Sequence, residues 1–292
     1  MANLKEIKNR ITSIASTMQI TSAMKMVSAA KLKRAQDAIT QMRPYAEKLQ
    51  EILSNLSATL DLSENAYSDQ REAKKVYIVA VTSNRGLCGG FNNNVIKKVN
   101  GLVKDEYAGA DIKIIAVGKK ANDAFKRSDM NFRPEGIGAA EDMFNDLSFD
   151  RSSETAQFLM DEFEAGNVDK VVVVYNKFKN AAVQVVQDEQ FLPIIPKVEE
   201  EGNASAGDYI FEPSKNEIVE DLIPKSLKIQ LFKALLDSHA SEHGARMTAM
   251  HKATDNASEL KRTLTLEYNK ARQAAITNEI LEIVGGAEAL NG

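Results

Sequence analysis

Two long stretches of helical sequence lie at opposite ends of this chain of 292 residues. The first runs from about Asn3 to Ser57 and the second from about Ser214 to Leu290. Both carry apolar stripes that an isolated helix cannot bury in water. The simplest solution packs the two stripes against each other. The sequence therefore predicts an α/β fold class with long terminal helices that form an antiparallel coiled coil.

Alternating spacings of four and three residues indicate coiled-coil seams in both segments. In the N-terminal segment the first stripe is Ile7, Ile11, Ile14 and Met18, and the second is Ile20, Met24 and Val27. In the C-terminal segment the same spacing joins Ile276, Ile280, Ile283, Ala287 and Leu290. Because proline lacks a backbone donor and clashes with the preceding turn, Pro44 should kink or divide the first helix near Arg43. Pro224 should place the start of the long last helix near Lys225.

The segment between the two ends has α/β character. Apolar runs predict strands at 76–81, 112–117 and 171–175, an antiparallel strand at 182–192, and helices at 119–127 and 153–165. Strands this apolar indicate a sheet covered on both faces. Ser153 is the expected N-cap of the second helix, Glu199–Asp208 an exposed loop, and Ser214–Glu217 a capping box.

The predicted organisation has three parts. A coiled-coil helix occupies residues 1–60, a Rossmann-like α/β domain residues 74–197, and a second coiled-coil helix residues 214–292. At 1.5 Å per residue the two helices are roughly 80 Å and 100 Å long, so the C-terminal one should project past the N-terminus by about 15 Å or more. The projecting end, from about Gln273, carries acids but no Lys or Arg and is apolar on more than one face. Such a tip should be enclosed by a partner.

Charge and cysteine content restrict the other possibilities. The net charge is −4, but residues 1–48 hold nine Lys or Arg against three Asp or Glu. This basic helix could contact nucleic acid, anionic lipid or an acidic protein surface, or simply be a solvated face. One cysteine, Cys88, excludes an internal disulfide and favours a reducing compartment. No run of 18 apolar residues predicts a membrane span, and the first residues lack a signal-peptide core.

Two small motifs have competing interpretations. The turn at Gly86–Gly90 could cradle a phosphate, but it lacks the P-loop ending and the dinucleotide-binding spacing. A tight strand–helix turn or a partner contact is expected instead, with Cys88 a small buried residue rather than a reactive thiol. His239 and His243 are four residues apart, as in a metal pair, yet no third ligand follows. We expect them and His251 to face solvent, and we expect no metal, cofactor or catalytic residue.

The chain resembles the gamma subunit of the rotary F-type ATP synthase over its full length. The motifs that carry the resemblance lie at Arg10–Leu32, Ser83–Asn92, Ala240–Met250 and Leu266–Glu279. Asn84 replaces the family's usual Asp, and Gly244 stands where Ala is common. The single cysteine excludes the redox segment of the chloroplast members.

The resemblance implies a non-catalytic central-stalk rotor in a hetero-oligomer. Its coiled coil would turn inside a ring of alpha and beta subunits, which hold the nucleotide sites. Its α/β domain would contact the epsilon subunit and the membrane c-ring. Proton flow would turn the ring and the stalk, forcing the catalytic sites through successive conformations. The location would be peripheral, at the cytoplasmic face of a bacterial inner membrane, without nucleic-acid partners.

The resemblance also implies contact residues. Four cations, Lys25, Lys31, Lys33 and Arg34, would face acidic loops of the beta subunit. Near the tip, Arg272, Gln273 and Thr277 would bond a beta-subunit loop. Met24 would lie near that loop or simply pack in the seam. The predicted contact residues are Met24, Lys25, Lys31, Lys33, Arg34, Arg272, Gln273, Thr277 and Glu279. Two rival functions remain: a nucleotide-binding α/β enzyme with helical dimerisation arms, and a coiled-coil adaptor on anionic membranes.

Overall fold

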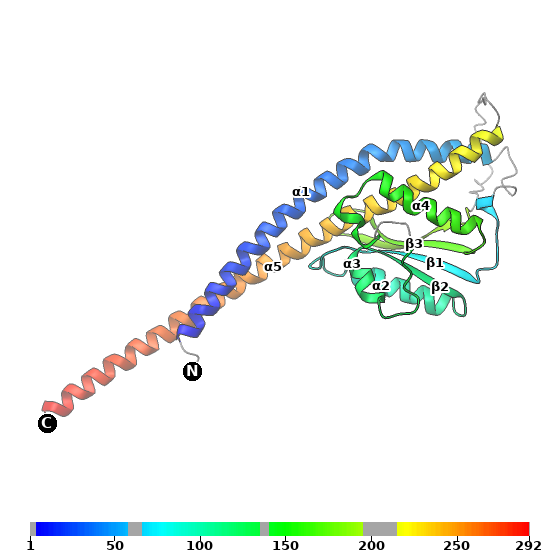
Figure 1. Ribbon diagram of the computed structural model, residues 1–292. Helices are drawn as coiled ribbons and strands as arrows, with labels where there is room; N and C mark the ends of the chain where they lie inside the picture. Colours follow the sequence, from blue (N-terminus) through cyan, green and yellow to red (C-terminus); the bar gives the residue numbers. More distant parts are fainter. Residues whose placement is uncertain (1–3, 58–65, 135–139, 195–214, 292) are drawn as a thin grey trace. The chain divides into compact units, whose positions relative to one another are not determined.

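The computed structural model describes residues 4–57, 66–134, 140–194 and 215–291, which form two compact units (Figure 1). The first unit comprises residues 1–28 and 247–292, and the second comprises residues 29–246. The helices α1, Leu4–Ser57, and α5, Lys215–Asn291, contribute to both units. Two sequence predictions, the acidic loop at 199–208 and the capping serine at 214, lie outside the described residues.

The first unit is the predicted coiled coil. On α1, Ile7 is buried, and the residues that follow it at spacings of four and three are half-buried as far as Met18. On α5, the buried seam residues include Ala257 and Leu264. The hydroxyl oxygens of Thr21 and Thr254 lie 2.8 Å apart, which fixes the register of the two helices.

The second predicted stripe on α1 is wrong, because Ile20 and Val27 are 60% and 58% exposed. The seam instead continues from Met18 through Thr21 and Ser28, which keep the four–three spacing but are polar. Each hydroxyl donates to a carbonyl of its own helix, at 3.1 Å for Thr21 and 2.8 Å for Ser28. Burial of these residues therefore leaves no hydroxyl donor unpaired.

Neither proline ends its helix, contrary to the prediction that α5 proper starts near Lys225. Of the two predicted effects of Pro44, division of α1 is wrong, and a kink stays a prediction. Pro44 is exposed, so water can satisfy the carbonyl that its ring leaves without a donor. Pro224 stands between Ile223 and Leu227, both buried in the core. Burial contributes about 1.5–3 kcal/mol for each of those side chains, enough to offset the roughly 3 kcal/mol that a proline costs inside a helix.

A four-stranded sheet forms the centre of the second unit. Its strands are β1, Lys75–Val81; β2, Asp111–Val117; β3, Lys170–Phe178; and β4, Gln184–Leu192. The spatial order is β2-β1-β3-β4, with β4 antiparallel to β3 and the other pairs parallel. All four predicted strands are thus confirmed.

Helices cover both faces of this sheet, as the unbroken apolar strands predict (Figure 1). On one face lie α2, Phe91–Gly101, and α3, Lys119–Phe125; on the other lie α4, Phe149–Glu164, and α5. Short helical turns η2, η3 and η4 occupy Ala66–Ser68, Leu102–Glu106 and Ala140–Asn145. The N-cap of α4 is Ser148, whose Oγ accepts from the Arg151 amide, so the predicted cap at Ser153 is wrong. Asp and Ser abound before this helix, and the sequence does not say which one adopts extended backbone.

Gly244 has a packing reason to be glycine. A Cβ there would lie 3.2 Å from Cα and 3.3 Å from the carbonyl oxygen of Ala181. We expect Gly244→Val to lower the free energy of unfolding by about 1–3 kcal/mol, because its methyl groups would push into backbone. Gly244→Ala should be nearly neutral, since a helix gain of about 1 kcal/mol offsets the tight contact.

Urea unfolding followed by circular dichroism measures both effects. Gly285→Val is the matched control, because nothing lies within 4 Å of the Cβ position at Gly285 on the same helix. Equal losses for Gly244→Val and Gly285→Val would contradict the packing argument.

Candidate partner-contact surfaces

Helix α5 fills the crevice where a sheet of this topology would bind a ligand. The strand order reverses between β1 and β3, and ligands of open α/β sheets bind beyond the carboxyl ends of the strands at such a point. Here the Ser241 hydroxyl of α5 donates to the carbonyl of Asn176 at the end of β3, at 2.9 Å. The Asn176 amide in turn donates to the Phe91 carbonyl at the start of α2, at 3.3 Å.

The loop that follows β1 is anchored by one buried arginine. Arg246 is 7% exposed, and its guanidinium donates to the carbonyl of Arg85 at 3.0 Å and of Gly86 at 3.3 Å. It also forms an ion pair with Glu242, with 2.7 Å between Nη1 and Oε1. The loop therefore presents carbonyl oxygens to α5, where a phosphate cradle would need amide donors. This geometry supports the interpretation of the glycine-rich motif as a tight strand–helix turn, and the alternative, a partner contact, stays a prediction.

Two histidines join this buried cluster, so the prediction that they face solvent is wrong. His243 is buried, its Nδ1 lies 3.3 Å from Arg246, and its Nε2 lies 3.1 Å from Nε2 of His239. His239 stacks on Phe144, with ring centroids 5.7 Å apart. Among the described residues, no group of three or more metal-ligating side chains accompanies them. Of the three, only His251 is exposed as predicted, paired with an aspartate four residues on.

Burial and neighbouring cations shift the titration of both histidines downward. Desolvation, with smaller effects of Lys31 and Arg246, lowers the pKa of His239 from 6.5 to about 4. Desolvation, followed by His239, Arg246 and Lys31, lowers the pKa of His243 from 6.5 to about 3. Both rings are neutral at physiological pH and act as packing and hydrogen-bonding groups.

We predict that these histidines make the chain acid-sensitive. Below pH 6.5 these histidines are protonated in the unfolded chain but stay neutral in the folded chain. Their contribution to the free energy of unfolding is therefore fully present above about pH 6.5 and is lost as the pH drops toward 4. The slope is at most about 1.4 kcal/mol per pH unit for each histidine. Burial raises the pKa of the adjacent Glu242 carboxyl, which opposes this loss. Urea unfolding of the wild type and of His239→Gln/His243→Gln across this range measures the difference. The exposed-site control His251→Gln should keep the wild-type slope.

Cys88 is a small buried residue, as predicted. It is 2% exposed, and the Asn92 amide donates to its sulfur at 3.1 Å. Burial raises the pKa of the Cys88 thiol, although Ser83 and Arg246 oppose that shift. The thiol is therefore protonated and shielded while the loop stays in place.

The predicted contact residues on α1 fall in both units. Met24 and Lys25 are half-buried in the first unit, beside the seam. Lys31, Lys33 and Arg34 are exposed in the second unit. Lys33 pairs with Asp37 on the same helix, 2.8 Å between Nζ and Oδ1, and both side chains remain mostly exposed. Lys31 lies close enough to the buried cluster to lower the pKa of His239.

The predicted contact residues on α5 are all exposed: Arg272, Gln273, Thr277 and Glu279. The Thr277 hydroxyl donates to the carbonyl of Gln273 at 2.9 Å, which leaves its lone pairs free to accept from a partner. These residues begin a stretch of α5 that extends past the start of α1 (Figure 1). We call the stretch Gln273–Glu288 the tip.

The tip carries its apolar side chains away from the seam. Ala275, Asn278 and Glu282 continue the seam spacing of α5 but are small or polar. Ile280 and Ile283 are 55% and 67% exposed, and the other exposed apolar side chains are Ile276, Leu281 and Val284. The isoleucines follow the seam positions by one or two residues, and each residue turns the helix by about 100°. The apolar surface is therefore a separate face, and a longer α1 would not cover it.

Two solved structures contain chains with the same fold. A chain of the Tetrahymena thermophila mitochondrial ATP synthase, titled central stalk/c-ring, has a TM-score of 0.57 at 23% identity over 80% of this chain and 99% of that chain. A chain of the Euglena gracilis mitochondrial ATP synthase rotor has a TM-score of 0.63 at 20% identity over 94% and 98%. The fold is that of the chains found in these stalk and rotor structures.

Sequence comparison shows the family. A family model described as ATP synthase matches residues 3–290. The ATP synthase gamma chain of Flavobacterium johnsoniae is 64% identical over 293 residues, and that of Christiangramia forsetii 62% identical over 294 residues, each covering all of both chains. The chain belongs to the ATP synthase gamma chain family, whose members are non-catalytic subunits. No helix in the described part of the chain is long and apolar enough to cross a membrane.

Proposed function

We propose that this chain is the central-stalk rotor subunit of a proton-translocating ATP synthase. Its coiled coil turns inside a ring of alpha and beta subunits, and its α/β domain contacts the epsilon subunit and the c-ring. The observation that carries this proposal is the tip, a single helix with Ile280 and Ile283 exposed on a face that its own partner helix cannot reach. An exposed apolar face of this kind requires an enclosing partner.

A rotor needs a surface that differs around its circumference in order to act differently on each surrounding subunit, and the basic N-terminal helix and the tip supply that difference. The cations of α1 attract acidic loops, whereas the tip has no Lys or Arg after Arg272. Arg272, Gln273 and Thr277 offer polar groups to a beta-subunit loop at the base of the tip, and Met24 lies near the same loop. Residues 1–60 and 214–292 form the coiled-coil shaft, and residues 74–197 form the α/β domain at its foot. The complex is peripheral, with its stalk at the cytoplasmic face of a bacterial inner membrane.

Co-purification tests this function directly. A tagged full-length chain expressed in its native cells should bring down larger nucleotide-binding subunits in a multisubunit ring, and the purified chain alone should have no ATPase activity. Recovery of the chain by itself would contradict the proposal. Nucleotide binding by the isolated chain would favour the enzyme alternative, and binding to anionic liposomes would favour the membrane adaptor.

Charge reversal on α1 is expected to weaken assembly without affecting folding. Lys33→Glu/Arg34→Glu removes two exposed cations and one surface ion pair worth about 0.5 kcal/mol or less. Association with the catalytic ring should slow by about tenfold at low salt and less at high salt, because the contact is electrostatic. Stopped-flow reconstitution with alpha and beta subunits measures this rate.

Lys119→Glu is the matched control, since Lys119 is exposed on α3 of the α/β domain rather than on α1. Normal association rates for the α1 variant would rule out these two cations as the contact. Slowing by Lys119→Glu to the same extent would show that net charge alone governs association.

A further inference from the structure

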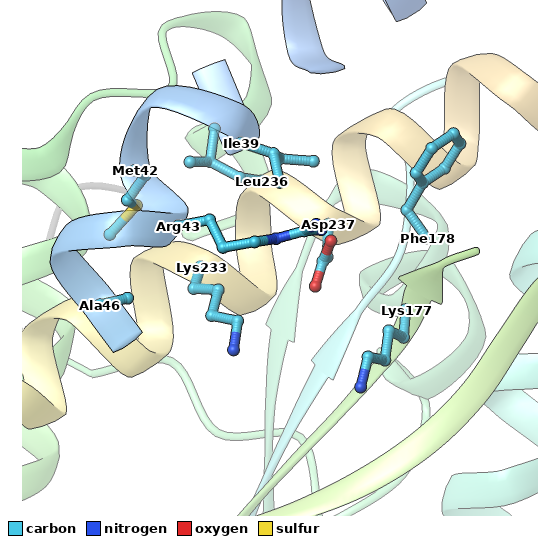
Figure 2. Close-up of a pocket in the computed structure, with 9 residues that line it drawn as sticks. All are labelled: Ile39, Met42, Arg43, Ala46, Lys177, Phe178, Lys233, Leu236 and Asp237. Carbon is cyan, nitrogen blue, oxygen red and sulfur yellow. The ribbon is translucent and has the colours of Figure 1, made fainter. Parts of the chain in front are cut away.

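A cavity of about 230 Å³ lies within the second unit, where α1, the end of β3 and α5 meet (Figure 2). Three cations line it, one from each element: Arg43 from α1, Lys177 from β3 and Lys233 from α5. Asp237 of α5 also lines it (Figure 2). With the carboxylate ionised, the lining carries a net charge of +2, three cations less one anion.

The carboxylate and the cations have different exposure. Asp237 is 4% exposed, whereas Arg43, Lys177 and Lys233 are exposed around it. Within the described part of the chain, none of these four side chains forms a hydrogen bond or an ion pair within 4.0 Å. Burial raises the pKa of the Asp237 carboxyl, and the three cations oppose that shift from a distance.

An occupant of this cavity must satisfy two requirements at once. It needs negative charge to balance the excess of cations, and it needs a hydrogen-bond donor that pairs with the Asp237 carboxylate in place of water. A sulfate ion has charge but no proton to donate. A phosphate group keeps a proton for part of the time at neutral pH, because its second pKa is about 6, and inorganic phosphate always keeps one there.

We propose that this cavity binds a protonated phosphate group, either as the free ion or on a small molecule. The cations hold the phosphate oxygens, and the phosphate hydroxyl donates to Asp237. The apolar part of the lining, which includes Met42, Phe178 and Leu236, leaves room for the carbon skeleton of a phosphate ester. Such an occupant bridges α1, β3 and α5, and this site is independent of the rotor function proposed above.

Calorimetric titration of the purified full-length chain at neutral pH and constant ionic strength tests the site. Inorganic phosphate, sulfate and glycerol 3-phosphate are the three ligands. We expect phosphate to bind at least about tenfold more tightly than sulfate, because only phosphate can pair with the carboxylate. Tighter binding of the ester than of the free ion would identify a phosphate-bearing molecule as the occupant, and the reverse order would identify the free ion.

Two variants separate the roles of the lining residues. Lys177→Ala/Lys233→Ala should weaken phosphate binding by at least about tenfold, through loss of two charge-assisted contacts. Asp237→Asn should abolish the preference for phosphate over sulfate, since the amide no longer requires a proton from the ligand. Lys97→Ala, an exposed lysine of α2 outside the cavity, is the control and should leave binding unchanged.

Three results would overturn the proposal. They are no binding of phosphate or its ester at millimolar concentration, binding that survives Lys177→Ala/Lys233→Ala, and equal affinity of the wild type for phosphate and sulfate. Circular dichroism melts of each variant establish that it is folded before its binding is compared.

Discussion

Replacing Arg246 with methionine is expected to lower the free energy of unfolding of the second unit by about 3–5 kcal/mol. The substitution keeps much of the side-chain volume but removes the charge that compensates Glu242, which is 6% exposed. It also removes the donors to the Gly86 carbonyl, whereas the Arg85 carbonyl still accepts from the Ser83 hydroxyl at 2.6 Å. The dominant loss is therefore an uncompensated buried carboxylate, with a smaller loss at the loop.

The single cysteine reports on the loop independently of global unfolding. Cys88 is a buried residue of the loop that Arg246 anchors, and its thiol is shielded in the folded chain. In Arg246→Met we expect the thiol to react with a disulfide reagent at least about tenfold faster, because the loop opens more often. Urea unfolding and thiol-reaction kinetics measure the two effects separately.

The double variant Glu242→Leu/Arg246→Met is the control for this prediction. Removing both charges leaves no uncompensated ion, so most of the lost stability should return, although Cys88 should stay reactive because the loop still lacks its donors. A single variant as stable as the wild type would contradict the anchoring role. A double variant as unstable as the single one would show that packing, rather than charge, is the cause.

The elements of this fold could be predicted where apolar periodicity was strong. The β1, β2 and β3 strands are short β-branched runs that are buried on both faces, and this apolar composition was enough to predict them. The spacing of isoleucines predicted two long terminal helices, α1 and α5. The rise of 1.5 Å per residue then predicted that α5 projects past the start of α1. These features depend on local composition, which one sequence displays directly.

The failures came where tertiary packing overrides local pattern. Thr21 and Ser28 are seam residues because their hydroxyls bond their own helix, which polarity alone does not reveal. Ile223 and Leu227 keep α5 helical through Pro224, a gain that only the folded core supplies. Pro44 does not divide α1 for the opposite reason, because an exposed proline can leave its carbonyl to water.

The buried cluster on α5 left one signal that sequence reasoning missed. From Asp237 to Arg246 the helix combines charged residues with Ser, Ala and Gly and contains no Lys. Small residues allow close approach of other backbone, so charges among them are buried and paired rather than solvated. The Glu242–Arg246 spacing of four residues then predicts an ion pair within the helix. What the sequence could not reveal is that the remaining donors of Arg246 reach a loop about 160 residues away.

We expect Ile280→Asp/Ile283→Asp to leave the isolated chain intact and to weaken its association with the catalytic ring by at least about 100-fold. Both side chains are more than half exposed, so their replacement should change the stability of the chain by only about 0.5 kcal/mol. In the complex each isoleucine would contribute about 1.5–3 kcal/mol of burial, and two carboxylates would be desolvated in its place. Reconstitution from purified subunits, read by ATPase activity and gel filtration, measures the association.

The matched control places the same charges on the other side of the same tip. Ala275→Asp/Asn278→Asp adds two carboxylates at positions that continue the seam, roughly opposite the isoleucine face. If the enclosing partner recognises the apolar face, this control should reduce association by no more than about tenfold, while the isoleucine variant loses far more. Equal losses of association in both variants would mean that the enclosing partner rejects added charge on any side of the tip, and that it does not recognise the apolar face in particular. Unchanged association of the isoleucine variant would remove the tip as the contact on which the proposed rotor function depends.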